Sequence, residues 1–229
     1  MDISLAYREK GEGEPLILLH GNGESGECFS ELSDLLSAKY RVIAPDTRGH
    51  GNSPRGNAPF TIESFADDLA KFCDGIGVRC AVILGFSDGA NIAMRFAIKY
   101  PGMVKALILV GGNLDASGVK PTAQIPIEIG YRVARFFSMF SERAGANAEM
   151  LGLMVKEPHI KPSELSCIRV PALVVAGTHD MIKKSHTELI AKSIHGARLL
   201  FLDGDHFLPY KEPVKMNIAL CDFLASVGL

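Results

Sequence analysis

The sequence reads Ala81-Val82-Ile83-Leu84-Gly85-Phe86-Ser87-Asp88-Gly89-Ala90-Asn91-Ile92-Ala93-Met94 at the point that decides its fold. The first half is aliphatic and β-branched, as in a buried strand, and the second half has the apolar spacing of a helix. Ser87 lies between them, with Gly85 and Gly89 on either side. A serine at the tip of such a tight turn has a strained backbone, and side chains at the two glycine positions would collide. The pattern therefore predicts a serine hydroxyl that projects beyond the end of a strand.

Strands and helices alternate along most of the chain around this stretch. Most of the expected strands are continuously apolar, which is typical of strands buried on both faces. Repeated strand–helix units of this kind predict an α/β fold, with a mostly parallel sheet of about seven strands flanked by helices. Further strands are expected at residues 3–8, 16–19, 40–46, 104–110, 172–177 and 198–202, and helices at 28–37, 62–72, 184–194 and 213–226, the second of them with Thr61 as its N-cap.

The pattern changes between residues 113 and 168, where no strand signal interrupts a series of amphipathic stretches. Pro121, Pro126 and Gly130 divide this segment into short pieces with helical spacing. We therefore expect a single domain over residues 1–229, with residues 113–168 inserted in it as a small helical cap.

Large side chains in the expected cap can either line an acyl pocket or pack in a core, and their helical spacing favours packing for most of them. They are Tyr131, Phe136, Phe137, Phe140, Met150 and Met154. Phe137 and Met154 are the candidates for contact with a substrate.

The composition is that of an ordinary soluble globular protein. The 229 residues are 47% hydrophobic and 22% charged, and the formal net charge is -2. Such a balance does not favour nucleic acid or an anionic membrane surface as a partner. No apolar run approaches the ~20 residues of a membrane span, and the start of the sequence lacks the pattern of a signal peptide. We expect a cytoplasmic monomer or homodimer that acts on a small-molecule substrate.

The cysteines give no sign of a disulfide framework or a metal site. Their number is odd and no Cys-x-x-Cys pair occurs, so they are expected to be reduced, buried thiols. No metal and no cofactor is predicted. The five cysteines are Cys28, Cys73, Cys80, Cys167 and Cys221.

The chain resembles the α/β-hydrolase fold family in five sequence motifs, which occur in the same order along the chain as in the family. They are His20-Gly21-Asn22-Gly23, the pattern Asp46-x-Arg48-Gly49-x-Gly51-x-Ser53, the Gly-x-Ser-x-Gly pattern around Ser87, Asp180 after a strand, and His206 after the last strand. Within the family it is most similar to small cap-bearing serine hydrolases, including carboxylesterases and the biphenyl-hydrolase-like branch, in which Gly-x-Ser-Asp-Gly also occurs. The resemblance implies that residues 85–89 form a nucleophile elbow.

A serine hydroxyl is a poor nucleophile at neutral pH and needs a base that a carboxylate orients. His206 lies in the turn after the last expected strand, and Asp180 follows a buried strand. The order Ser87, Asp180, His206 is the order that this fold uses. Asp203 and Asp205 are rival carboxylates because they are so near the histidine in sequence.

Six other histidines compete with His206 for the role of base. His20 precedes a glycine turn and is expected to brace that loop. The others are expected in loops or on helix faces, where a solvated ring is the simplest expectation, and they are His50, His159, His179, His186 and His195.

An oxyanion needs hydrogen-bond donors that are already in place. The backbone N–H of Asp88, at the start of the helix, is one candidate, and the resemblance implies the backbone N–H of Asn22 as the second. The Asn22 side chain either hydrogen-bonds a substrate or only makes the turn. The Asp88 carboxylate either is simply stabilised by the dipole at the helix N-terminus or binds a cationic group of the substrate, such as the ammonium of an α-amino ester.

Arg48 lies in the loop that the family uses to support the active-site side of the sheet. It can bind a substrate carboxylate, although pairing with nearby backbone carbonyls is the favoured interpretation.

Position 87 separates classes within the family. Haloalkane dehalogenases and epoxide hydrolases of this fold carry an aspartate as nucleophile, whereas this chain has a serine. The resemblance therefore implies a serine hydrolase that forms an acyl-serine intermediate on small to medium carboxylic esters. The alternatives are an amidase or aminoacyl-ester hydrolase, a C–C bond hydrolase with the same triad, or a non-catalytic ligand-binding protein of this fold.

Overall fold

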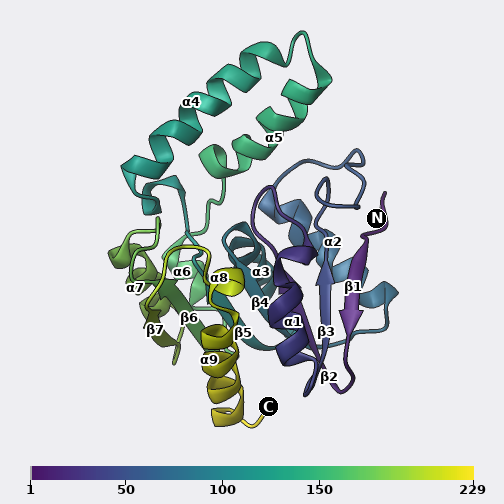
Figure 1. Ribbon diagram of the computed structural model, residues 1–229, viewed down its shortest axis with the longest axis vertical. Helices are drawn as coiled ribbons and strands as arrows, with labels where there is room; N and C mark the ends of the chain where they lie inside the picture. The colour runs from purple at the N-terminus through teal and green to yellow at the C-terminus, as the bar shows by residue number, and fades with distance from the viewer. Residues whose placement is uncertain (1) are drawn as a thin grey trace.

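The computed structural model describes residues 2–229, which form a seven-stranded sheet with helices on both faces (Figure 1). The strand order is β1-β3-β2-β4-β5-β6-β7, and only β1 runs antiparallel to its neighbour. The expected α/β-hydrolase architecture with a mostly parallel sheet is confirmed. The strands are β1 (Tyr7–Lys10), β2 (Glu14–Leu19), β3 (Tyr40–Pro45), β4 (Ala81–Phe86), β5 (Val104–Val110), β6 (Ala172–Gly177) and β7 (Arg198–Leu202).

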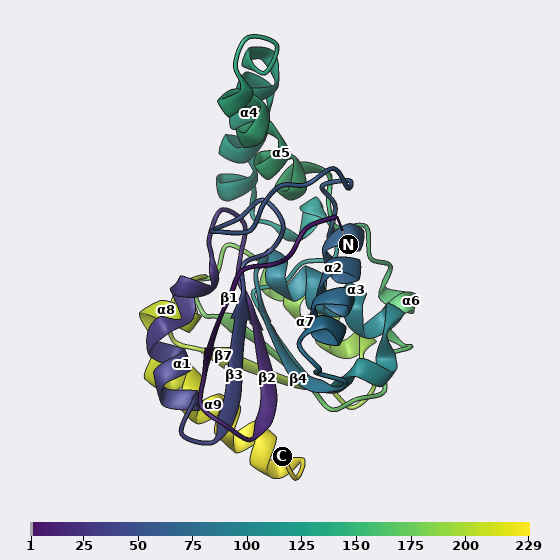
Figure 2. The same ribbon diagram turned by 90° about the vertical axis from the view of Figure 1, so that its right-hand side faces the viewer.

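Two hydrophobic cores lie on the two faces of the sheet. One core packs α2 (Ile62–Gly75), α3 (Asp88–Lys99) and α7 (Lys184–Ser193) against the sheet. The other packs α1 (Ser30–Leu36) and α9 (Pro213–Ser226) against the opposite face (Figure 2). Alternate residues of β2 fall into the two cores, as expected for a strand covered on both faces.

Some element bounds differ from the sequence prediction. The first strand was expected at 3–8, but β1 covers Tyr7–Lys10 because its register is set by pairing with β3, from Tyr7 opposite Pro45 to Lys10 opposite Val42. The helix expected from residue 28 is divided into a 3-10 turn at Gly26–Phe29 and α1. Thr61 is the N-cap of α2, and its hydroxyl accepts the Ser64 backbone N–H.

Two long helices, α4 (Pro121–Phe137) and α5 (Glu142–Lys156), form a hairpin between β5 and β6. The hairpin stands apart from the sheet in both views (Figures 1 and 2). The prediction that Pro126 and Gly130 divide this segment is wrong, since both residues lie inside α4. A proline near the start of a helix removes a single backbone hydrogen bond, and the following turns continue the helix.

The remaining helices are short. They are α6 (Pro162–Leu165), α8 (Leu208–Lys211) and the 3-10 turns η2 (Pro101–Met103) and η3 (Ala116–Gly118). Across residues 2–229, no helix combines the length and the apolarity that crossing a membrane requires. All five cysteines are free, but only Cys73 is buried. Cys28, Cys80 and Cys221 are half-buried, and Cys167 is exposed because its turn lies at the surface after α6, so the prediction of buried thiols is wrong for Cys167 and holds fully only for Cys73.

Candidate active site

The sharp turn between β4 and α3 exposes Ser87. Its backbone has φ 53° and ψ -120°, and among residues 2–229 it is the one non-glycine residue with positive φ. A Cβ at Gly85 would overlap the carbonyl oxygen of Gly89, and a Cβ at Gly89 would overlap that of Leu19. The two glycines are therefore required by close backbone approach, as the sequence pattern predicts.

Ser87, His206 and Asp180 form a continuous hydrogen-bonded chain. His206 Nε2 lies 3.0 Å from Ser87 Oγ, and His206 Nδ1 lies 2.7 Å from Asp180 Oδ1. Asp180 Oδ1 also accepts the Ile182 backbone N–H at 2.8 Å. Because Asp180 accepts a hydrogen bond from the Nδ1–H group of His206, Nε2 of a neutral His206 carries no proton and can accept the proton of the serine hydroxyl.

The register of the parallel sheet brings the three residues together. Gly85 lies opposite Leu109 across β4 and β5, and Gly177 lies opposite Leu202 across β6 and β7. The segments that follow these strands therefore leave the sheet at the same edge. Parallel strands place residues far apart in sequence at one edge in this way.

The rival carboxylates turn away from His206. Asp205 accepts a hydrogen bond from the Phe207 backbone N–H and pairs with Lys211. Asp203 accepts a hydrogen bond from the Thr178 hydroxyl. Of the three aspartates, Asp180 is the one that accepts a hydrogen bond from the His206 ring.

Two histidines expected to be solvated are buried. His50 is 3% exposed and stacks on Phe60, while His186 is 9% exposed and its Nε2 accepts the Leu114 backbone N–H at 2.9 Å. The prediction failed for both because the covering residues come from other parts of the chain. His159, His179 and His195 are exposed as expected.

The loop that carries Asn22 is held from two sides. The His20 ring bonds the Gly21 carbonyl through Nδ1 at 2.8 Å and accepts the Thr47 backbone N–H through Nε2 at 2.9 Å. Glu24 accepts the Gly21 backbone N–H at 3.1 Å. Burial lowers the pKa of His20 to about 4, so the ring is neutral at pH 7. His20 braces this loop, in agreement with the sequence interpretation.

The Asn22 side chain connects the elbow with the helical hairpin. Its Nδ2 donates to Asp88 Oδ2 at 3.0 Å and to the Met150 carbonyl of α5 at 2.8 Å. An amide group has two N–H donors, so both are used within the protein. This arrangement leaves no Asn22 donor for a substrate, and it fixes the backbone of the loop next to Ser87.

Asp88 is 8% exposed and belongs to a network of amides. Its Oδ1 accepts the Asn91 amide at 3.1 Å, and Asn91 also bonds Asn113 through both its Nδ2 and its Oδ1. Burial raises the pKa of the Asp88 carboxyl, while the amides of Asn22 and Asn91 oppose that shift. As the first residue of α3, Asp88 has a backbone N–H that no helical carbonyl accepts, which suits an oxyanion donor.

Sequence reasoning missed three residues of this site. Asn91 lies three residues after Asp88 on the same helix face, which is the signal that could have found it. Asn113 follows β5 at the edge of the sheet. Gly111 has φ 61°, and a Cβ there would lie 2.8 Å from Cε1 of the His206 ring.

Arg48 is a buried structural residue. It is 1% exposed, and its guanidinium pairs with Asp68 at 2.7 Å and with Asp2 at 2.7 Å, besides donating to the Arg55 carbonyl. The favoured interpretation, pairing with backbone carbonyls, is therefore incomplete, because two carboxylates of the chain itself hold most of its donors.

An open groove of about 620 Å³ runs between the hairpin and the Asn22 loop. Asn22, Phe137 and Met154 line it, whereas Asp88 is not among its lining residues. Phe136 and Phe140 are exposed, so core packing is wrong for them. The complete lining is Asn22, Gly23, Gly130, Val133, Ala134, Phe137, Ala144, Asn147, Met150, Leu151 and Met154.

No group of three or more His, Cys, Asp or Glu side chains arranged to hold a metal ion occurs among residues 2–229. The chemistry that the site offers is that of an oriented serine, an imidazole held by a carboxylate, and backbone N–H donors.

The chain belongs to the alpha/beta hydrolase fold family, whose sequence profile matches residues 14–154. The magnesium-chelatase 30 kDa subunit of Rhodobacter capsulatus is 31% identical over 210 residues, which are 86% of this chain and 73% of that protein. The serine hydrolase BPHL of Homo sapiens is 26% identical over 97% of this chain and 83% of its own length.

A crystal structure of a hydrolase from Pseudomonas aeruginosa PA01 superposes with a TM-score of 0.80 at 26% identity, covering 97% of this chain and 94% of that one. Uncharacterized proteins of Mycobacterium tuberculosis and Mycobacterium bovis are 31% identical over 125 residues, and that match spans 53% of this chain and only 37% of theirs. The family is one of hydrolases.

Proposed function

We propose that this protein is a serine hydrolase that cleaves small to medium carboxylic esters through an acyl-serine intermediate. The observation that carries the proposal is the chain Ser87 Oγ, His206 Nε2, His206 Nδ1 and Asp180 Oδ1, with contacts of 3.0 and 2.7 Å. Ser87 is the proposed nucleophile, His206 the general base and Asp180 the carboxylate that orients the base.

In the first half of the proposed reaction, Ser87 Oγ attacks the ester carbonyl carbon while His206 Nε2 takes the hydroxyl proton. The tetrahedral intermediate collapses as the C–O bond to the alcohol breaks, and the imidazolium returns the proton to the leaving alkoxide. In the second half, His206 removes a proton from water, which attacks the acyl-serine carbonyl carbon. The bond from that carbon to Ser87 Oγ then breaks, the imidazolium returns the proton to Ser87 Oγ, and the acid is released. The buried Asp180 carboxylate stabilises the imidazolium in both halves.

The negative charge on the intermediate's oxygen requires fixed donors. We assign this role to the backbone N–H groups of Asn22 and Asp88. The braces on the Asn22 loop, from His20 and Glu24 to Gly21, support this assignment because they hold the loop before substrate arrives. Each such donor is worth about 3–4 kcal/mol in other enzymes.

We further propose that residues 113–168 act as the cap and that the groove of about 620 Å³ takes the acyl chain. Phe137, Met150 and Met154 provide an apolar wall there. A groove of this size suits a small to medium acyl group.

The test compares wild type with Ser87→Ala on p-nitrophenyl esters of graded chain length. Wild type is expected to hydrolyse them and to react with a fluorophosphonate probe, whereas Ser87→Ala should lose at least ~10⁴-fold in kcat and should not be labelled. Ser163→Ala, at an exposed serine, is the matched control and should behave as wild type. Equal activity of the two Ser variants, or no labelling of wild type, would refute the proposal and favour a non-catalytic ligand-binding role.

Amides, aminoacyl esters and C–C bonds are cleaved by the same machinery, so the substrate panel decides among them. The aminoacyl alternative depends on Asp88, whose two oxygens already accept amide donors. If Asp88 nevertheless receives an ammonium group, Asp88→Asn should lower the ratio of aminoacyl-ester to simple-ester rates. An unchanged ratio would exclude that alternative.

A further inference from the structure

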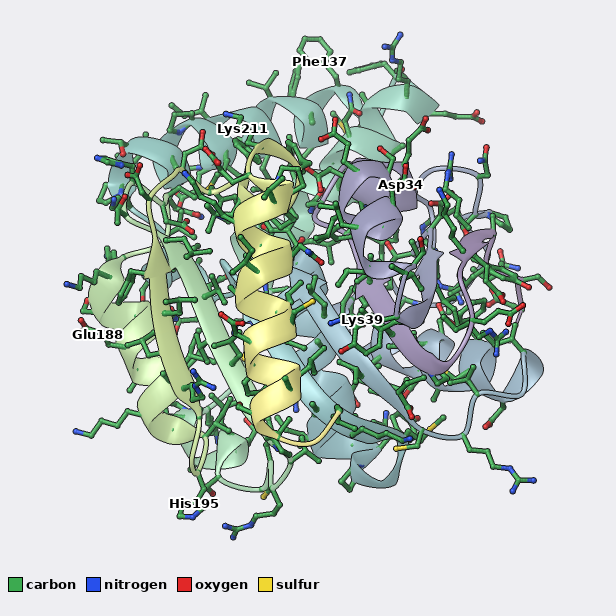
Figure 3. The ribbon with its side chains drawn as sticks, turned by 60° about the horizontal axis from the view of Figure 1, so that its bottom comes forward. Asp34, Lys39, Phe137, Glu188, His195 and Lys211 are labelled. Carbon is green, nitrogen blue, oxygen red and sulfur yellow. The ribbon has the colours of Figure 1, made fainter. Side chains whose placement is uncertain are left out.

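The outer face of α4 exposes an unusual number of large apolar side chains. Their positions follow helical spacing along one side of the helix and continue into the turn before α5. Figure 3 shows Phe137 at the outer edge of the hairpin, directed away from the sheet. This α4 face consists of Ile125 (54% exposed), Ile129 (57%), Val133 (52%), Phe136 (59%), Phe137 (53%), Met139 (69%) and Phe140 (75%).

The area of the α4 face matches what a stable protein interface needs. Half-exposed side chains of this size present roughly 100 Å² each, so the seven together present about 700–800 Å². The largest apolar patch on a typical monomer is about 300–600 Å². One partner in a standard protein–protein interface buries about 800 Å².

Charged residues beside the α4 face point to a second copy of the same chain. Glu128 and Arg132 are four residues apart, so they lie along one edge of the face. In the part of the chain that the structure covers, neither of the two has an ion pair within 4 Å. When two such helices pack antiparallel about a two-fold axis, this edge meets the same edge of the second copy in the opposite direction. Glu128 of each copy then lies opposite Arg132 of the other, and the contact occurs twice.

The same charges argue against a lipid surface. Residues 121–156, which form the hairpin, contain three glutamates, three arginines and one lysine, a net charge of only +1. Helices that bind anionic membranes carry a large excess of Lys and Arg on their polar face. The mixed charges of the hairpin favour a complementary protein surface instead.

We propose that the α4 face is the interface of a homodimer in which the α4 helices of two copies pack antiparallel about a two-fold axis. Val133 and Phe137 belong both to this face and to the wall of the 620 Å³ groove. The second copy therefore covers the open side of the groove and completes the enclosure of the acyl chain. The statement about the acyl chain rests on the proposed function, while the oligomeric state does not.

Sedimentation equilibrium of the full chain between about 1 and 100 µM tests the dimer. Wild type is expected to be dimeric, and Ile129→Glu should raise the dimer dissociation constant by roughly 100-fold or more because it buries a charge in the interface. Ile218→Glu, at a position of α9 that is 55% exposed against 57% for Ile129, is the matched control and should stay dimeric. Circular dichroism spectra and melting temperatures of all variants verify that each is folded.

A charge exchange tests the antiparallel geometry. Glu128→Arg should weaken the dimer, and the double variant Glu128→Arg/Arg132→Glu should restore it, because the exchange occurs at both ends of the two-fold contact. A double variant weaker than the single one would overturn the antiparallel arrangement. Wild type that remains monomeric at 100 µM would overturn the dimer, and flotation of such a monomer with vesicles of phosphatidylcholine and phosphatidylserine would assign the face to lipid.

The nucleophile variant separates this proposal from the proposed function. Ser87→Ala should dimerise as wild type does, whether or not Ser87 is the nucleophile. If the enzyme is active, Ile129→Glu should raise KM for the longer esters more than for the acetate ester. Only longer acyl chains reach the side of the groove that the second copy covers in the wild-type dimer. An equal change in KM for all esters would refute the closure of the groove.

Discussion

Replacing His20 with glutamine should flatten the pH dependence of stability below neutral pH. The ring is 1% exposed, and both of its nitrogens are used in a single protonation state. Nε2 accepts the Thr47 backbone N–H at 2.9 Å, so the proton must be on Nδ1, which donates to the Gly21 carbonyl at 2.8 Å. A second proton on Nε2 would face the Thr47 N–H and break that bond.

The size of the effect follows from the pKa. Burial lowers the pKa of His20 to about 4, below the ~6.5 of an unfolded chain. Between these two values the unfolded state binds more protons than the folded state, so stability falls as the pH decreases from about 6.5 towards 4. The linkage relation gives a loss of about 2 kcal/mol between pH 7.5 and pH 5 for this one residue.

The assay is urea unfolding followed by circular dichroism at several pH values from 7.5 to 5. His20→Gln should be less stable than wild type at pH 7.5, by about 1 kcal/mol for the lost bond to Gly21, but it should lose about 2 kcal/mol less on acidification. The other buried histidines titrate in both proteins and largely cancel in the comparison. His195→Gln, at an exposed histidine (Figure 3), should leave the pH dependence unchanged. Parallel curves for wild type and His20→Gln would refute the reasoning.

Three further substitutions test the close contacts around the site. Gly89→Ala places a methyl group against the Leu19 carbonyl and should lower the free energy of unfolding by about 3 kcal/mol or more, measured by urea unfolding. Asp68→Ala leaves the buried Arg48 without its buried carboxylate partner and should cost about 3–5 kcal/mol in the same assay. Asn22→Ala removes both amide donations and should lower kcat on p-nitrophenyl acetate by roughly tenfold, with KM changed much less, because the loop carrying the oxyanion donor is loosened.

Matched controls accompany the first two variants. Gly102→Ala has no heavy atom within 4 Å of the new methyl group and should change stability little. Asp34→Ala breaks an exposed pair with Lys10, in which both side chains are more than half exposed, and should cost at most about 1 kcal/mol. Gly89→Ala as stable as Gly102→Ala, or Asp68→Ala as stable as Asp34→Ala, would contradict the packing argument. An Asn22→Ala enzyme with unchanged kcat would show that the loop is held without its side chain.

The strands and the covering helices were predictable because their signals are local. The apolar runs of β4, β5 and β6 and the cap at Thr61 are readable from a few neighbouring residues. The two helices of the hairpin were less predictable. A proline is also a local signal, but here it indicated a break at Pro126 that α4 does not have. Packing of α4 against α5 stabilises the helix.

The elbow at Ser87 and the strand ends at which Asp180 and His206 lie follow from the amino-acid sequence, since glycine spacing and strand order constrain these positions whatever packs around them. Which groups face those residues depends on the folded arrangement of the chain. That arrangement connects the Asn22 amide to Asp88 and to α5, and it leaves the apolar face of α4 uncovered. Burial and hydrogen bonding between segments that are distant in sequence depend on how the folded chain brings those segments together. The spacing of neighbouring residues does not determine this arrangement.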